Sequence, residues 1–134
     1  MANMAYTQNI NIPGPYNWKN RILLVFSSHD NVQIDQQLNL FSAHQAGMDE
    51  RDLIVFKVLS DKVIQPQGKE YDKNAAEKLR RQYNVDKNDF TVILIGKDGT
   101  EKLRQQKVLS IDKLFATIDA MPMRRREMRN SDGG

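Results

Sequence analysis

One stretch decides the fold, and it reads Ile22-Leu23-Leu24-Val25-Phe26-Ser27-Ser28-His29-Asp30-Asn31. Its five apolar residues show no alternation of period two, which predicts a strand with both faces buried inside an α/β sheet. In such sheets the loop that follows the carboxyl end of a strand is the usual place for a functional site. We therefore expect any site of this chain in the polar half of the stretch.

The composition indicates one globular domain. A chain of 134 residues fits a single domain, since domains cluster at roughly 100 to 150 residues. No apolar run approaches the ~20 residues that cross a bilayer, so the chain is not expected to span a membrane. Residues 1–20 lack the apolar centre of a signal peptide, so no leader is expected in this chain.

The positive charge is concentrated at the carboxyl end. Residues 123–134 carry four arginines and two acids, which leaves +1 of the net charge of +3 for the rest of the chain. The arginines are Arg124, Arg125, Arg126 and Arg129. No aromatic residues lie among them to stack on bases, which does not favour nucleic acid as a partner. A polyanion such as heparin and a tail packed on local acids both stay open.

The elements after the first strand alternate between helices and strands. A helix capped by Asp30 or Asn31 is predicted to end at Gly47. In a later helix, Arg80 is expected to face solvent beside Lys78 and Arg81. The later elements are a strand at 53–59, a mobile loop or insertion at 60–71, a helix at 72–84, a strand at 90–95, an Asp-Gly hairpin at 96–104, and a helix at 110–121 that Pro122 ends.

This order predicts an α/β, thioredoxin-like fold, βαβαββα, with a four-stranded mixed sheet flanked by three helices. A flavodoxin-like doubly wound sheet is the second choice, because it needs a crossover helix where this chain has a hairpin. The expected organisation is an extended amino-terminal arm at 1–16, a thioredoxin-like domain at 17–122 and a basic tail at 123–134.

Three separate stretches stand in a fixed order: Trp18-Lys19-Asn20-Arg21, Ile95-Gly96-Lys97-Asp98-Gly99 and Ile118-Asp119-Ala120-Met121-Pro122-Met123-Arg124-Arg125-Arg126-Glu127-Met128-Arg129. Together they resemble the P-DUDES family, a domain of unknown function found in bacterial proteins and in vertebrate matrix proteins such as the sushi-repeat-containing proteins and coiled-coil domain-containing protein 80. The resemblance extends from Tyr16 to Arg129. It implies a thioredoxin-like fold, an extracellular or cell-envelope location for many members, and no settled activity.

The absence of cysteine is the strongest chemical statement in the sequence. It excludes thiolate nucleophiles and dithiol exchange. Redox-active thioredoxin-like proteins carry Cys-x-x-Cys at the start of the helix after the first strand. They also carry a cis-proline just before the third strand. We therefore predict a redox-inactive chain without a cofactor, whose binding residues lie at the vacated positions. These are Ser27, Ser28, His29, Asp30, Asn31, Asp89 and Phe90.

Two alternatives stay open for that loop. The free N–H groups at a helix start attract anions, which predicts a weak anion site. Alternatively, Asp30 caps the helix and repels an anion. Ser28 and His29 are not predicted to be catalytic, because adjacent residues in a turn seldom point at one another and no third group orients the base.

Other polar residues are assigned structural roles. His29 and His44 lie at opposite ends of one helix, so no metal site is predicted. Lys97 lies in a predicted turn, where Lys97→Ala should cost less than about 0.5 kcal/mol. Trp18 is expected to be a mostly buried anchor at the entrance to the first strand.

The predicted function is a cysteine-free binding or interaction module with a protein or matrix partner. An enzyme with non-thiol chemistry at the loop after the first strand is the second hypothesis. A polyanion-binding domain that uses the arginine-rich tail is the third. A pocket in which His29 meets a carboxylate or Lys19 would favour the enzyme.

Overall fold

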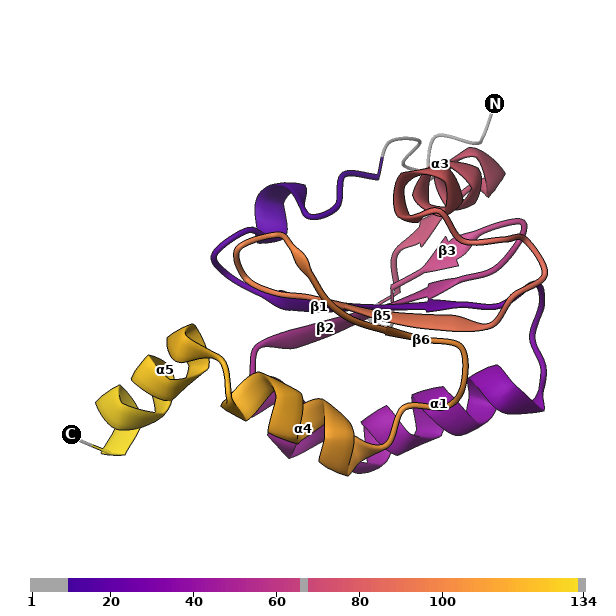
Figure 1. Ribbon diagram of the computed structural model, residues 1–134. Helices are drawn as coiled ribbons and strands as arrows, with labels where there is room; N and C mark the ends of the chain where they lie inside the picture. Colours follow the sequence, from indigo (N-terminus) through magenta and orange to yellow (C-terminus); the bar gives the residue numbers. More distant parts are fainter. Residues whose placement is uncertain (1–9, 66–67, 133–134) are drawn as a thin grey trace.

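A mixed sheet of six strands, in the order β4-β3-β2-β1-β5-β6, forms the middle layer of the protein (Figure 1). The computed structural model describes residues 10–65 and 68–132. Along the chain the elements are a 3-10 turn η2 (Gly14–Tyr16), β1 (Arg21–Phe26), α1 (Val32–Ala43), α2 (Gln45–Glu50), β2 (Leu53–Val58), β3 (Val63–Ile64), β4 (Glu70–Tyr71), α3 (Lys73–Tyr83), β5 (Thr91–Ile95), β6 (Glu101–Gln105), α4 (Ile111–Asp119) and α5 (Pro122–Asp132).

The central strand β1 is buried on both faces, as the unbroken apolar run predicts. It pairs in parallel with β2 and antiparallel with β5. Ile22, Leu24 and Phe26 enter the core on one face of the sheet, whereas Leu23 and Val25 enter the core on the other. The mixed sheet and its strand directions confirm the thioredoxin-like prediction.

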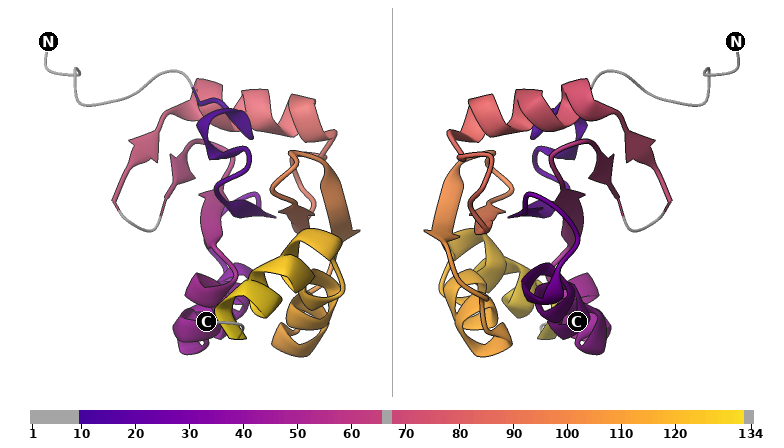
Figure 2. Two further views of the ribbon diagram at one scale, coloured as in Figure 1. Left: turned by 90° about the vertical axis from the view of Figure 1, so that its left-hand side faces the viewer. Right: turned by 90° about the vertical axis from the view of Figure 1, so that its right-hand side faces the viewer.

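Helices cover the two faces unequally. Helix α3 lies on one face, together with Ile10 and Ile12 of the amino-terminal segment, and α1 and α4 lie on the other (Figure 2). Helices α1, α3 and α4 begin at side-chain caps: Asn31 accepts from Ile34 N, and Asp72 and Ser110 cap α3 and α4 in the same way. Helix α5 lies outside both layers, beside the amino ends of β1 and β2.

The sheet has six strands where the sequence predicted four. The predicted loop at 60–71 contains β3 and β4, which pair with each other and extend the sheet beyond β2. Each strand has only two residues, too few for an alternating pattern to be detected. Val63 and Tyr71 are nevertheless buried in the core under α3, which explains why this segment folds against the sheet. Residues 66–67 lie outside the described residues.

The helices also differ from prediction, because residues 10–65 and 68–132 contain five α-helices instead of three. The first helix does not end at Gly47: α1 ends at Ala43, and Gly47 lies inside α2. A Cβ at this glycine would lie 2.6 Å from the ring of Phe115 in α4. The glycine therefore permits close packing of α2 on α4. Residues 123–132, expected to be part of a basic tail, belong to α5.

Candidate functional site

The backbone of the loop after β1, residues 27–31, is tied to its neighbours on several sides. We call these residues the β1 loop. Ser27 N donates to Val58 O at 3.0 Å, and Ser28 O accepts from Ser60 N at 3.2 Å. From α3, Arg80 Nη2 donates to Ser27 O at 2.8 Å. The loop is therefore held in place by β2, the segment after it and α3.

The side chains of the β1 loop mostly satisfy one another. Ser27 Oγ donates to His29 O at 2.7 Å, and Asn31 Nδ2 donates to Ser27 Oγ at 3.2 Å. Asn31 Oδ1 accepts from Ile34 N at 3.1 Å, so Asn31 is the helix cap and Asp30 is not. Asp30 instead forms an ion pair with Lys57 of β2. The helix start therefore has a satisfied cap and an adjacent carboxylate.

Ser28 and His29 do meet, contrary to the sequence-based expectation. Ser28 Oγ lies 2.8 Å from His29 Nδ1. His29 is exposed, and in the described part of the chain no carboxylate bonds to its ring, since Asp30 faces Lys57. Lys19 belongs to the segment that enters β1 at its other end. The pair has the geometry of a nucleophile and base without the group that orients the base.

Arg80 is the unexpected member of this region. It was predicted to face solvent, but it is only 8% exposed. Its Nε and Nη1 have no hydrogen-bond partner within the described chain, and its guanidinium lies 5.6 Å from the ring centroid of Phe26. Burial lowers the pKa of Arg80, and the nearby charge of Asp86 acts against this.

The sequence did contain a signal for the burial of Arg80. It follows Ala76 by four residues in α3, and Ala76 is fully buried, so Arg80 lies on the inward face of the helix. The signal was missed because arginine is rarely buried without an acidic partner. The role of Arg80 in holding Ser27 depends on the tertiary structure.

Asp89 and Phe90 lie at the same end of the sheet as the β1 loop. The antiparallel register places Phe26 opposite Thr91, which brings the start of β5 beside the end of β1. Phe90 is buried in the core on the α1 and α4 face. Asp89 Oδ2 accepts from Gln106 Nε2 at 3.1 Å. Of these two predicted binding residues, Asp89 has a side chain that could contact a partner, whereas the Phe90 side chain belongs to the core.

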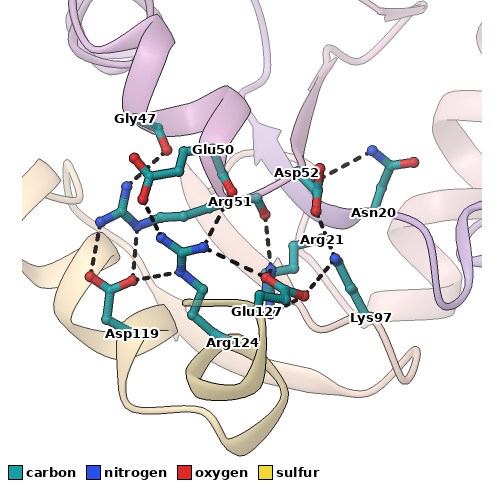
Figure 3. A network of polar contacts seen from close by, with 10 residues as sticks. All are labelled: Asn20, Arg21, Gly47, Glu50, Arg51, Asp52, Lys97, Asp119, Arg124 and Glu127. Carbon is teal, nitrogen blue, oxygen red and sulfur yellow. Dashed lines mark hydrogen bonds and ion pairs between the residues drawn. The ribbon is translucent and has the colours of Figure 1, made fainter. Parts of the chain in front are cut away.

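The opposite end of β1 carries most of the buried charge. Four cations and four carboxylates form what we call the ion cluster, which joins the amino ends of β1 and β2 to α4 and α5 (Figure 3). Its members are Arg21, Glu50, Arg51, Asp52, Lys97, Asp119, Arg124 and Glu127. This grouping was not predicted from the sequence, because its residues are separated by up to 106 positions.

Glu127 of α5 is the centre of one half of the cluster. Arg21, 1% exposed, donates two bonds to its carboxylate at 3.2 and 3.3 Å. Lys97 Nζ lies 2.7 Å from Glu127 Oε2 and 2.7 Å from Asp52 Oδ2. Lys97 lies in the turn as predicted, but it is a buried link between the β5–β6 hairpin, the start of β2 and α5. We therefore expect its substitution to cost more than the sequence suggested.

Arg124 is the centre of the other half. It is 3% exposed, and its guanidinium reaches Asp119 Oδ1 at 3.0 Å and Glu50 Oε2 at 2.5 Å. Arg51 donates to the same Asp119 and lies 3.8 Å above the ring of Phe115. Arg124 is therefore engaged by the body of the protein. The other three arginines of this segment are exposed: Arg125, Arg126 and Arg129.

Two carboxylates of the cluster, Glu127 and Asp119, are stabilised in their charged form. Burial by itself would raise the pKa of Glu127, but hydrogen bonds from Lys97 and Arg21 outweigh it and the pKa lies below its usual value. Burial and hydrogen bonding oppose each other in the same way at Asp119, where bonds from Arg51 and Arg124 lower the pKa. These groups are not suited to exchange protons near neutral pH, so we assign the cluster a structural role.

Trp18 lies close to the ion cluster but not inside the protein. It is 65% exposed, so the expectation of a buried anchor is wrong. Its backbone has a positive φ of 70°, and its N–H donates to Lys97 O at 2.7 Å. The main chain of Trp18 thus fixes the turn before β1, and its indole remains at the surface.

The described residues contain neither a cluster of metal-ligating side chains nor a membrane-spanning helix. Within residues 10–65 and 68–132, no three side chains of the metal-ligating types gather into a group. No helix in the part of the chain that the structure covers combines the length and apolar character needed to cross a membrane.

The fold is shared with peroxiredoxins. The reduced 2-Cys peroxiredoxin of Plasmodium vivax is 14% identical with a TM-score of 0.61, over 83% of this chain and 82% of that chain. Thioredoxin peroxidase I of Plasmodium yoelii is 17% identical with a TM-score of 0.61, over 83% and 78%. At these identities the similarity concerns the fold alone. No curated protein sequence matches the chain. Residues 14–127 match the family described as "Domain of unknown function (DUF4174)".

Proposed function

The chain belongs to the DUF4174 family, a domain of unknown function, and we propose that it is a binding module without thiol chemistry that uses the β1 loop to contact a protein partner. The resemblance to the P-DUDES family, with its extracellular or cell-envelope setting and matrix partners, stays a prediction beside this membership. The proposal concerns the end of the sheet at which α/β folds usually bind ligands.

One observation carries the proposal: the β1 loop is fixed from inside while its outer side chains stay exposed. Arg80 holds Ser27 O, and Asn31 caps α1. Outward, His29 is exposed and Val32, at the first turn of α1, is 74% exposed. A loop that is already ordered loses little conformational entropy when it binds, which favours recognition.

The test is affinity capture from the source organism with mass spectrometry, using the loop variant His29→Ala/Val32→Ser. Both side chains are exposed, so the fold should persist. We expect proteins that the wild type retains to be lost from this variant. They should be kept by a matched control on α4, Asp112→Ala/Thr117→Ala. Equal retention by both variants would remove the β1 loop as the binding surface.

Thiol chemistry can be tested separately. A chain without cysteine cannot form the thiolate needed to reduce a disulfide or to attack a peroxide. We expect no turnover of insulin disulfides or hydrogen peroxide by the metal-free protein. Measurable turnover would contradict this part of the proposal without bearing on partner binding.

An enzyme is the second candidate, because Ser28 Oγ lies 2.8 Å from His29 Nδ1. The chemistry would be acyl transfer with Ser28 as nucleophile and His29 as base. Hydrolysis of an activated ester such as p-nitrophenyl acetate tests it. The enzyme hypothesis requires that Ser28→Ala and His29→Ala each abolish the activity. Activity that survives Ser28→Ala would dismiss it.

A polyanion is the third candidate partner, because Arg125, Arg126 and Arg129 are exposed on α5. The variant Arg125→Ser/Arg126→Ser/Arg129→Ser leaves Arg124 and the ion cluster intact. If these arginines bind polyanions, the salt concentration needed to elute the protein from heparin should fall. Unchanged elution would dismiss α5 as a polyanion-binding element.

A further inference from the structure

Half of β2 forms an open edge of the sheet. Strand β3 pairs only with Lys57 and Val58, at the carboxyl end of β2. On the other side β2 pairs with β1 along its full length. In the described residues, no strand pairs with segment 53–56 of β2 on the side away from β1. Strands β3 and β4 lie beside the carboxyl half of β2 (Figure 1).

The ladder with β1 determines which main-chain groups of β2 face this edge. Arg21 N donates to Asp52 O at 3.0 Å, and Ser27 N donates to Val58 O at 3.0 Å. In a parallel ladder, alternate residues bond to the same neighbour, so the even-numbered residues of β2 bond to β1. The N–H and C=O groups of Leu53 and Val55 therefore point away from β1. None of these four groups has a hydrogen bond to the described chain outside the sheet ladders.

A groove of about 810 Å³ runs along this edge. Residues 53–55 of β2 line it, with Tyr16 and Gln65 toward the α3 face and Met48 and Asp49 from α2 toward the other face. Tyr16 is fixed by edge-on packing against Phe56, with ring centroids 5.7 Å apart. The groove thus offers main-chain groups along its floor and side-chain contacts on both sides.

The charge of the groove selects a kind of ligand. Asp49 and Asp52 line it, and no basic residue does. Asp52 is bonded to Lys97, but its side chain remains 47% exposed. Asp49 is exposed, and within the described residues its carboxylate accepts from a neutral amide, Gln45 Nε2, at 2.8 Å and from no basic side chain. A basic side chain would complement this wall.

The other edge of the sheet is protected, and this one is not. The outer strand β6 carries Glu101, Lys102 and Arg104 and has a register shift against β5. Charges and bulges on an edge strand prevent pairing with another chain. The open segment of β2 reads Leu53-Ile54-Val55-Phe56 and has neither charge nor proline.

We propose that this edge of β2 binds an extended peptide segment by strand addition, and that a lysine or arginine of the peptide contacts Asp49. The peptide runs antiparallel to β2, in line with β3, and bonds to the four main-chain groups of Leu53 and Val55. About four peptide residues cover the edge, since a strand rises about 3.3 Å per residue. This surface lies away from the β1 loop and does not depend on the function proposed for it.

Hydrogen exchange of the free protein tests the geometry first. The amides of Leu53 and Val55 should exchange faster than those of Ile54 and Phe56, which bond to β1. Uniform protection of all four amides would overturn the proposal, because the edge would then be occupied.

Selection of random linear decapeptides displayed on phage against the full chain tests binding. We expect enriched peptides with alternating β-branched residues and a lysine or arginine. In the best peptide, N-methylation of a residue whose N–H faces β2 should lower the affinity about tenfold, because one hydrogen bond is lost. N-methylation at the intervening residues should leave the affinity unchanged. The amides of Leu53 and Val55 should shift on binding and become protected.

Two variants of the chain locate the site. Asp49→Lys should lower the affinity for the peptide at least about threefold, because it reverses the charge of the groove wall. Asp61→Lys, an exposed acid outside the groove, is the matched control and should leave affinity unchanged, as should His29→Ala/Val32→Ser in the β1 loop. Failure of the β1 loop proposal therefore leaves this result intact.

Three results would overturn the proposal. They are the absence of enriched peptides, tolerance of N-methylation at every position, and amide shifts confined to other surfaces. Concentration-dependent protection of Leu53 and Val55 without peptide would assign the edge to a second copy of this chain and would also overturn it.

Discussion

The two ends of β1 are held by different forces. At the amino end, Arg21 is buried and bonded to Glu127 of α5. At the carboxyl end, the β1 loop is held mainly by hydrogen bonds between neutral groups, with Arg80 donating to a carbonyl beneath it. Removing one partner of a buried ion pair is costly, because it leaves the other charge buried and unpaired. The amino end therefore tolerates little change, whereas outward side chains of the loop can vary without loss of the fold.

The largest expected effect is at Glu127. Glu127→Ala leaves Arg21 and Lys97 buried without their shared carboxylate. We expect a loss of about 3 kcal/mol in the free energy of unfolding, at the lower end for a broken buried pair, because the Glu127 side chain is itself 26% exposed. Chemical denaturation measures it.

The matched control is Glu101→Ala, which removes a surface pair with Arg104 on β6. That change should cost no more than about 1 kcal/mol. Similar losses from the two variants would mean that the ion cluster contributes no more than a surface pair, and the contrast between the ends of β1 would disappear.

Lys97→Ala should have the next largest effect, about 1 to 3 kcal/mol for the loss of a partner to buried charged groups. Lys97 bonds to both Asp52 and Glu127, but Glu127 keeps Arg21, so the loss should be smaller than that from Glu127→Ala. A loss below about 0.5 kcal/mol would restore the interpretation of Lys97 as an ordinary turn residue.

Acid should lower the free energy of unfolding by less than Glu127→Ala does. The reason is that a protonated Glu127 carboxyl still forms hydrogen bonds, whereas alanine forms none. The pKa values of Glu127 and Asp119 are lower in the folded protein than their usual values of 4.5 and 3.8. The unfolded chain therefore binds protons first as pH falls, and stability that is complete above about pH 5 declines below it.

The pH dependence can be assigned by comparing the wild type with Glu127→Gln. Free energies of unfolding measured between pH 7 and pH 3 should decline less steeply in Glu127→Gln, which has lost one of the shifted carboxyls. Parallel curves for the two proteins would show that Glu127 does not contribute to the acid sensitivity.

The smallest expected effect is at the carboxyl end. Asn31→Ala removes the cap of α1 and should cost about 1 kcal/mol. Asn31→Asp keeps an acceptor for Ile34 N and should cost less. A loss from Asn31→Ala as large as that from Glu127→Ala would mean that the two ends of β1 are equally constrained.

Local signals in the sequence predicted much of this protein. The burial of residues 22–26 followed from an unbroken apolar run, and Asn31 was one of the two residues predicted to cap the first helix. These features depend on residues close in sequence, so one sequence is enough to find them. The thioredoxin-like order of elements then followed from the predicted hairpin at residues 96–104, although the two short strands β3 and β4 were not predicted.

Only the tertiary structure decided the features that depend on distant residues. Arg21, Lys97 and Glu127 come from the three stretches behind the resemblance to P-DUDES, and nothing in their spacing indicates that they meet. Arg21 and Arg124 are buried where the fold brings carboxylates to them, whereas Arg80 is buried against Ser27 O and the ring of Phe26. The exposure of Trp18 likewise depends on what the fold places over it. The open edge of β2 arises because β3 is only two residues long. A sequence specifies local preference directly, but contacts and edges arise from how the whole chain packs.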